Sequence, residues 1–314
     1  MDHTVNQADI AKKSTVDWSA GAAYIDGKFM PLAEAKIPVT DWAYRRSDVV
    51  YDVVTVWDGV FFRLDDHIAR FRRSIERYRF TPKETDEEIR EILHRLMALS
   101  GLRSAYVAMD CLRGQGAPGV RNPAKARNYI ACYASPFSTL LPADKIERGM
   151  HMIVSSTPRI PQACVDATAK NFHWGDMNIS MFEADDKGAD FPVLLDLDGN
   201  VTEGPGFNVF TVTDGVVATP DYNMLEGVSR QSVMELCDEL GLKLEVRKVS
   251  AEELRDADEI FVTSSAGGVV GVSRIDGRIL NNDRPGPISA KIRETYWEKR
   301  KQGWHGEPVK YDLV

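Results

Sequence analysis

The stretch from Val53 to Phe62, Val-Val-Thr-Val-Trp-Asp-Gly-Val-Phe-Phe, carries the clearest indication of the fold. β-Branched and aromatic residues favour strands on both sides of Asp58-Gly59, and an Asp-Gly pair supplies the positive φ angles of a tight hairpin turn. Two antiparallel strands are therefore predicted here. Similar turns are predicted at four more pairs: Asp26-Gly27, Asp198-Gly199, Asp214-Gly215 and Asp276-Gly277.

Helical patterns alternate with these hairpins. Thr85-x-x-Glu88 matches a capping box, the apolar residues after it recur at helical spacing, and Gly101 is suited to end the helix. Similar patterns predict helices over about 67–78, from Ser250 onward and over about 288–300. Hairpin-rich sheets mixed with helices indicate an α+β fold and not a run of βαβ units.

The chain of 314 residues is long enough for two domains, and its 43% apolar and 27% charged residues are typical of a globular protein. Prolines and small polar residues from Ala134 to Pro142 interrupt two strand-like runs, over 128–133 and 150–155. We therefore expect one domain over residues 1–134, a linker over 135–145 and a second domain over 146–314.

Charge and cysteine content argue against several functions. With 39 basic and 47 acidic side chains the net charge is −8, which disfavours binding to nucleic acid or to an anionic membrane. The four cysteines form no CxxC pair and the six histidines show no ligand spacing, so we expect neither disulfides nor a metal site. No apolar run is long enough for a membrane span, and the first 18 residues lack the apolar core of a signal peptide. We therefore expect a cytoplasmic protein that acts on a small molecule.

One glycine motif is misleading. Gly114-x-Gly116-x-x-Gly119 follows a strand-like run and matches the dinucleotide-binding fingerprint. That fingerprint must open a helix, whereas Pro118 and the Val-Arg-Asn-Pro that follows Gly119 disfavour one. We interpret the motif as a mobile loop.

A lysine in weakly polar surroundings is the first candidate for chemistry. Lys170 stands in the stretch 166–176, Asp-Ala-Thr-Ala-Lys-Asn-Phe-His-Trp-Gly-Asp, among small and aromatic residues. Poor solvation lowers the pKa of a lysine and gives the neutral amine that Schiff-base formation needs. Composition alone also fits an ordinary surface lysine. Asp176 is predicted to cap a helix that runs to about Lys187.

A carboxylate and two possible anion sites follow along the chain. Glu203 is expected at the end of a strand beside a glycine turn, where it either pairs with a cation such as a protonated pyridine nitrogen or faces water. Hydroxyls and free amides in 226–231, before a helix to about Leu240, and in 263–268, at a strand end, could hold a phosphate. Serine and glycine in such places also simply cap helices and form turns.

Together these stretches resemble the fold-type IV, or class IV, pyridoxal-phosphate-dependent aminotransferases. The resemblance runs from Ala22 to about Trp297, in the family's order, and is closest to the (R)-selective amine transaminases. It is carried by the five stretches 47–59, 62–70, 170–176, 202–208 and 264–268. It implies a smaller N-terminal α/β domain, a larger C-terminal pseudo-barrel domain with the active site between them, and a homodimer whose two chains line each site.

The resemblance also implies roles for single residues. Lys170 would be the Schiff-base lysine and the proton carrier, and Glu203 would pair with the ring nitrogen of pyridoxal 5′-phosphate (PLP). The phosphate of PLP would be held by Arg70, Val228, Ser229 and Ser265. The substrate pocket would include Arg46, Tyr51, Val53, Trp57, Arg121 and Ala266.

Several residues depart from the pattern of the amine transaminases. Arg46 stands where a histidine is usual, and Pro205 stands where Ser or Thr is more common. Ser264-Ser265 replaces a Thr-Thr pair, and the loop 113–121 is longer than in the fungal enzymes. These departures concern the rim of the substrate pocket and leave Lys170, Glu203 and Arg70 unchanged.

The resemblance implies transfer of an amino group from an (R)-amine or a D-amino acid to a 2-oxo acid such as pyruvate. One alternative is the same chemistry restricted to D-amino acids or to branched-chain L-amino acids, where every donor has a carboxylate. The other is pyruvate elimination by an aminodeoxychorismate-lyase-like enzyme. Arg121, on a loop that contains glycines, would bind the acceptor's carboxylate. Arg46 would add a second positive site, or would pair with Asp48 and only support the fold.

Overall fold

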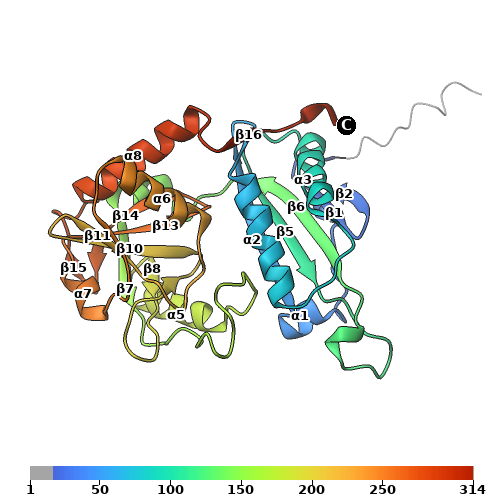
Figure 1. The fold of residues 1–314 in the computed structure, drawn as a ribbon, viewed down its shortest axis with the longest axis horizontal. Helices are drawn as coiled ribbons and strands as arrows, with labels where there is room; N and C mark the ends of the chain where they lie inside the picture. The colour runs from blue at the N-terminus through green and yellow to red at the C-terminus, as the bar shows by residue number, and fades with distance from the viewer. Residues whose placement is uncertain (1–16, 314) are drawn as a thin grey trace, which may run out of the picture.

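The computed structural model describes residues 17–313, which form two β-sheets side by side, each with its own helices (Figure 1). The first sheet of this described part has seven strands in the spatial order β16-β4-β3-β5-β6-β1-β2. They are β1 (Ala22–Ile25), β2 (Lys28–Pro31), β3 (Val49–Trp57), β4 (Val60–Phe62), β5 (Ala105–Leu112), β6 (Tyr129–Pro136) and β16 (Gly306–Pro308). The last strand of the chain therefore joins a sheet built otherwise from the N-terminal half.

The second sheet has nine strands within residues 17–313 and combines antiparallel with parallel pairs. Its main path is β12-β11-β10-β13-β14-β7-β8, while β15 pairs with β14 and β9 pairs with β10. The strands are β7 (Met150–Val154), β8 (Phe191–Val193), β9 (Glu203–Gly204), β10 (Phe207–Thr213), β11 (Val216–Thr219), β12 (Leu244–Val246), β13 (Glu259–Ser264), β14 (Gly268–Ile275) and β15 (Arg278–Ile279). The mixture of hairpins and helices confirms the predicted α+β class.

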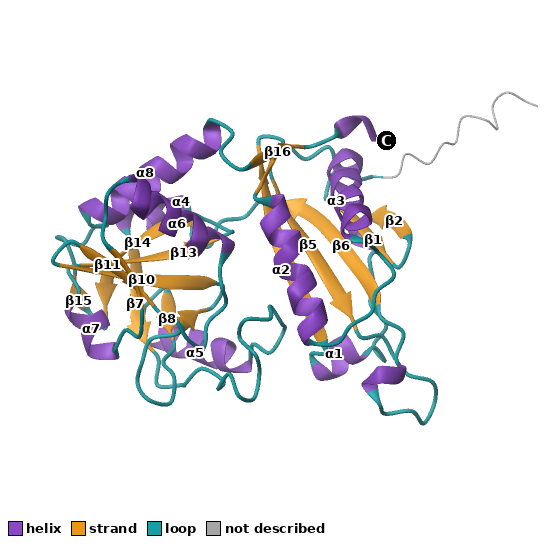
Figure 2. Cartoon of the chain, in the orientation of Figure 1, coloured by secondary structure: helices purple, strands orange, loops and turns teal. Residues whose placement is uncertain are grey.

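Helices cover one face of the first sheet and pack against both faces of the second. On the first sheet α2 (Leu64–Arg77) and α3 (Asp86–Ser100) lie across the strands (Figure 2), where fully buried Val54, Phe71 and Leu93 form part of one core. On the second sheet α6 (Val228–Glu239) and α8 (Pro287–Lys301) pack against β13 and β14. Shorter helices are α1 (Trp42–Arg46), α4 (Ala143–Arg148), α5 (Gly175–Asp186) and α7 (Ala251–Asp256). No helix within residues 17–313 is both long and apolar enough to cross a membrane.

The Asp-Gly turns are confirmed. Four of the five join directly paired antiparallel strands, and the aspartates there have φ angles of 47°, 48°, 51° and 47° in chain order. The fifth, Asp198-Gly199, lies in the turn closed by an antiparallel bridge between Leu195 and Val201. Left-handed backbone at these sites is tolerated by Asp and Gly, which explains why sequence located the hairpins.

Helix boundaries follow the predicted caps with one exception. The capping box before α3 is present, because the Glu88 amide donates to Thr85 Oγ1 at 3.2 Å and the Thr85 amide donates to Glu88 Oε2 at 2.8 Å. Ser250 likewise caps α7, and the Gly114–Gly119 motif opens no helix; the next helical element is the 3-10 turn Pro123–Lys125. The prediction for Asp176 was wrong: Trp174 occupies the cap position of α5, and Asp176 lies inside the first turn.

The residues in which we looked for a signal peptide lie almost entirely outside the described range.

We expect the capping box to stabilise the protein measurably. Thr85→Ala removes the acceptor of the Glu88 amide, so the free energy of unfolding should fall by about 1 kcal/mol. Urea unfolding followed by far-UV circular dichroism measures this loss. Thr85→Ser keeps a hydroxyl at the cap and is the control; equal losses for both variants would contradict the capping role.

Candidate active site

A cavity of about 340 Å³ lies between the two sheets. β3 and β5 of the first sheet contribute Tyr51, Val53 and Tyr106 to its wall. The second sheet and its helices contribute further lining residues: Glu203, Val228, Ser229, Thr263, Ser264, Ser265 and Ala266. The segment between β7 and α5 adds Arg159 and Lys170. Most of the residues that sequence singled out therefore meet around one space.

A fully buried carboxylate organises the first-sheet side of the cavity. Asp52 on β3 binds Arg70 on α2 through two contacts, from Nε at 2.7 Å and from Nη2 at 2.8 Å. His67 Nδ1 lies 2.7 Å from the same carboxylate. The adjacent Arg70 and His67 hold the pKa of Asp52 well below its usual range despite burial. Arg70 is thereby fixed at the wall, where its Nη1 also donates to the carbonyl of Glu226 at 3.2 Å.

The backbone of Lys170 is tied to the same elements. Its carbonyl accepts from the Tyr51 amide at 3.0 Å, and its amide donates to Ser74 Oγ at 3.0 Å. The Lys170 Nζ lies 4.4 Å from the centroid of the Tyr51 ring. Removal of the amine from solvent, aided by the positive charge of Arg70, lowers the pKa of Lys170 to about 8. Roughly a tenth of this amine is therefore neutral and nucleophilic at pH 7 and about half at pH 8, far more than for a lysine at its usual pKa, as the sequence indicated.

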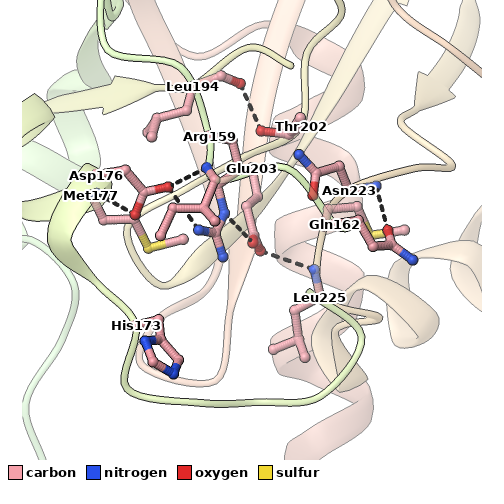
Figure 3. A network of polar contacts seen from close by, with 12 residues as sticks. Arg159, Gln162, His173, Asp176, Met177, Leu194, Thr202, Glu203, Asn223 and Leu225 are labelled. Atoms are coloured by element: carbon pink, nitrogen blue, oxygen red, sulfur yellow. Dashed lines mark hydrogen bonds and ion pairs between the residues drawn. The ribbon is translucent and has the colours of Figure 1, made fainter. Parts of the chain in front are cut away.

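On the opposite wall, Glu203 is held by two donors (Figure 3). The Leu225 amide donates to Glu203 Oε2 at 3.0 Å, and Arg159 Nε donates to Oε1 at 3.1 Å. Burial raises the pKa of Glu203, and the charge of Arg159 opposes that rise. Arg159 also pairs with Asp176, which is why Asp176 does not cap α5: its carboxylate turns back to this network.

The start of α6 forms an anion cradle. No side chain caps its first turn, and its cap residue is Gly227. A Cβ atom on Gly227 would lie 2.0 Å from Asn208 Oδ1, so only glycine fits here. Val228 and Ser229, the first two residues of the helix, line the cavity, where the amides of a helix N-terminus attract negative charge.

Thr263 is a site residue that sequence reasoning did not single out. It is 2% exposed, lines the cavity, and its Oγ1 has no hydrogen-bond partner within the described residues. An orphaned buried hydroxyl in a cavity wall indicates a missing ligand. The only sequence signal was its place at the head of the Thr-Ser-Ser stretch. Arg159 was also missed, and nothing in its local pattern distinguishes it.

The predicted substrate residues divide into two groups. Tyr51, Val53 and Ala266 line the cavity. Three others do not line it. Trp57 is 42% exposed and meets Phe137 edge-to-face and Trp297 at a tilt. Arg46 lies over the Trp42 ring at 3.9 Å, and Arg121 is exposed on the loop after β5.

The suggested ion pair between Arg46 and Asp48 is not formed. Arg113 Nε donates to Asp48 Oδ2 at 3.0 Å instead, while its other nitrogens donate to the carbonyls of Tyr78 and Arg79. Arg113 is well placed for this because it directly follows β5, beside Asp48 at the start of β3. Arg46 therefore keeps an exposed guanidinium.

The cavity thus combines a partly neutral amine, a carboxylate fixed by two donors, and a phosphate-sized cradle of arginine, helix amides and hydroxyls. Such walls suit a flat phosphorylated ligand with a basic ring nitrogen and a carbonyl that can react with an amine. Apolar and aromatic side chains complete much of the lining, with Tyr51, Val53 and Tyr106 from the first sheet and Leu140 beside Ala266.

Known proteins of one family are similar to this chain in sequence and in fold. The profile of the family described as Amino-transferase class IV matches residues 49–275. The D-alanine aminotransferase of Bacillus licheniformis is 27% identical over 85% of this chain and 93% of its own length. The branched-chain-amino-acid aminotransferase of Escherichia coli (strain K12) is 28% identical over 90% of this chain and 95% of its own.

Solved structures agree with these relatives. A crystal structure of a bacterial enzyme, the branched-chain amino acid aminotransferase of Escherichia coli, superposes with a TM-score of 0.87 at 27% identity, over 93% of this chain and 100% of that one. Another branched-chain amino acid aminotransferase, crystallised with pyridoxamine 5′-phosphate, superposes with a TM-score of 0.86 at 30% identity, over 93% of this chain and 99% of that one. The family profile spans well over half of the chain, and the chain therefore belongs to the class IV aminotransferases, which are enzymes that depend on PLP.

Proposed function

We propose that the protein moves an amino group from an (R)-amine or a D-amino acid to a 2-oxo acid such as pyruvate. One observation supports an uncharged donor above all. The cations that line the cavity within the described residues are Arg70, Arg159 and Lys170. Both arginines are already engaged by buried carboxylates, and Lys170, with its pKa of about 8, loses its charge above that pH. Among the described residues of the cavity wall, no cation is therefore free to bind a carboxylate on the amino donor.

The charge of Asp110 also supports a donor without a carboxylate. Asp110 lies directly opposite Tyr51 in the β3–β5 pairing, on the sheet face that contributes Tyr51 and Tyr106 to the cavity. Its carboxylate has no hydrogen bond or ion pair within residues 17–313, and burial raises its pKa to about 7. When ionised it repels a carboxylate on the donor. An amine without a carboxylate meets no such penalty.

The residues present fit the cofactor of the family. The orphaned Thr263 hydroxyl and the uncapped start of α6 supply donors for a phosphate, beside the fixed guanidinium of Arg70. We propose that Arg70, Val228, Ser229 and Ser265 hold the phosphate, that Glu203 holds the ring nitrogen, and that Lys170 is the covalent attachment point. Thr263 joins this set.

PLP, when bound, supplies an electron sink for charge that develops on the substrate carbon. Residues of the chain move the proton, orient the ring and exclude water. Lys170, with its pKa of about 8, moves a proton to and from that carbon, and Tyr51 packs beside its amine at 4.4 Å. Glu203, fixed by Leu225 and Arg159, orients the ring, while buried aromatic walls exclude water.

The acceptor's carboxylate needs a cation from outside the cavity wall. We propose that Arg121 supplies it and that Arg46 adds a second positive site. The loop of Arg121 projects away from the second sheet (Figure 1), so it serves the site of a second copy in a homodimer. Large apolar side chains on α5, on α1 and just before α1 are exposed in the single chain: Val39 74%, Tyr44 73%, Ile179 60% and Phe182 72%. Burial of these against a second copy supports the dimer.

We also propose two domains, over 1–134 and 146–314, with a linker over 135–145 and the shared site between them; β16 is the one strand that the second range adds to the first sheet. Two features support this division: the separate cores of the two sheets and the cavity lined by both. A cytoplasmic location is supported by the four cysteines, all free thiols.

A second candidate is transfer from branched-chain L-amino acids. It is favoured by the names of the E. coli relative and of the protein crystallised with pyridoxamine 5′-phosphate, both branched-chain aminotransferases. The engaged arginines of the cavity and the nearby Asp110 disfavour it just as they disfavour D-amino acids, because both kinds of donor carry a carboxylate; among the candidate donors they favour the (R)-amine.

We expect Lys170 to be the attachment point of the cofactor. Borohydride reduction of the holoenzyme should place the label on Lys170, found by peptide mass mapping, and Lys170→Ala should lose at least about 10²–10⁴-fold in kcat. In the apoprotein, acylation of this amine should rise with pH through about 8, because only the deprotonated form reacts. Exposed Lys291 is the internal control; label on another lysine would overturn the assignment.

Donor preference tests the proposed function. Single-turnover absorbance changes of the PLP enzyme should be fastest with (R)-1-phenylethylamine, measurable with D-alanine, and at least about tenfold slower with L-leucine. (S)-1-Phenylethylamine is the stereochemical control. Fastest reaction with L-leucine would instead establish the branched-chain candidate.

A hybrid dimer tests whether two chains share each site. Co-expressed Lys170→Ala and Arg121→Ala chains, separated by two affinity tags, form a hybrid in which one site has both residues and the other has neither. With pyruvate as acceptor, this hybrid should recover about half of the wild-type activity, well above either parent variant. Half of the Arg121→Ala rate would show that Arg121 acts within its own chain, and a monomeric mass in solution would refute the dimer.

A further inference from the structure

Three buried charged residues form one connected group behind the ring-nitrogen position (Figure 3). Arg159, Asp176 and Glu203 are 5%, 8% and 5% exposed. Arg159 Nη1 lies 2.7 Å from Asp176 Oδ2, and Arg159 Nε lies 3.1 Å from Glu203 Oε1. A single guanidinium is therefore shared between two carboxylates that come from different parts of the chain.

The two carboxylates are not equivalent partners of Arg159. Asp176 makes the shorter contact and also accepts from two backbone amides, that of Ile160 at 2.7 Å and that of Met177 at 2.9 Å. Glu203 makes the longer contact and has one backbone donor, the Leu225 amide. Of the two residues, Glu203 is the one that lines the cavity. Most of the charge of Arg159 is thus compensated on the side away from the cavity.

The net charge of this group determines which ligand it favours. One guanidinium and two ionised carboxylates leave a single negative charge in excess, in a place where water is excluded. A buried charge without a partner is costly, so the group favours a cation beside Glu203. Lys170 is the nearest other cation of the chain that acts on Glu203, and its own low pKa limits how much charge it supplies.

We propose that Asp176 is a positioning residue that takes up the charge of Arg159, and thereby leaves Glu203 with a full negative charge to hold a protonated ring nitrogen. Without Asp176, Arg159 and Glu203 would form a closed neutral pair with no demand for a further cation. This inference rests on the proposed function, in which Glu203 faces the ring nitrogen of PLP.

The test is the ¹⁵N chemical shift of the ring nitrogen in enzyme loaded with ¹⁵N-labelled PLP, because this shift reports directly whether the nitrogen carries a proton. Asp176→Asn keeps the size of the side chain and removes one negative charge. We expect the signal to move from the pyridinium range toward that of neutral pyridine, and the affinity for PLP to fall about tenfold. Asp186→Asn, at an exposed position on the same helix, should change neither.

A double variant separates charge from structure. Removing Arg159 as well, in Asp176→Asn/Arg159→Met, leaves Glu203 alone and restores the single negative charge. The ring nitrogen should then regain its proton, although one more buried contact has been lost. A purely structural role for Asp176 predicts further damage and no rescue, and that result would overturn the proposal.

Two further outcomes are decisive. If Glu203→Gln leaves the ¹⁵N signal unchanged, Glu203 is not the partner of the ring nitrogen and the proposed role of Glu203 itself fails. If Glu203→Gln shifts the signal and Asp176→Asn does not, only the present inference is overturned. Should Asp176→Asn fail to fold, Arg159→Met alone raises the excess to two negative charges and must keep the nitrogen protonated; a neutral nitrogen in that variant also overturns the inference.

Discussion

The bidentate contact between Asp52 and Arg70 is the interaction on which the geometry of the site depends. It joins β3 to α2 inside the first core, and both partners are buried, so removing either would leave an uncompensated charge. One helical turn after Arg70, Ser74 accepts from the backbone amide of Lys170. The same helix therefore sets the position of the anion-binding arginine and of the reactive lysine.

Charge compensation inside the chain then determines what the cavity can bind. Arg70 is engaged by Asp52, and Arg159 is engaged by Asp176 and Glu203. The Asp52–Arg70 pair has no net charge, whereas the group of Arg159, Asp176 and Glu203 on the opposite wall carries one negative charge in excess. A ligand with a phosphate at the α6 end and a protonated ring nitrogen at the Glu203 end matches both. A carboxylate on the amino donor finds no uncommitted cation on either of these walls. The charges proposed to hold the cofactor are therefore not available to the substrate.

Local features of the fold were predictable because their causes are local. Asp-Gly pairs, the Thr85–Glu88 capping box and the Ser250 cap act within a few residues, and each formed as expected. The reactive groups were also predictable, because only residue types such as Lys170 and Glu203 can perform their chemistry. Trp57 and Arg121 lie outside the cavity of the single chain, and their predicted substrate roles depend on packing that residue type does not reveal.

Sequence by itself determined the α+β class, the hairpins and the caps at Thr85 and Ser250, and it located the lysine, the carboxylate and the serine-containing stretches that line the cavity. Tertiary structure decided which charges meet. Asp176 looked like a helix cap, yet it pairs with Arg159, 17 residues away, and Arg159 reaches Glu203 across 44 residues. The reason is physical: a capping preference is worth about 1 kcal/mol, whereas an unpaired buried guanidinium costs several, so the long-range pairing prevails over the local pattern.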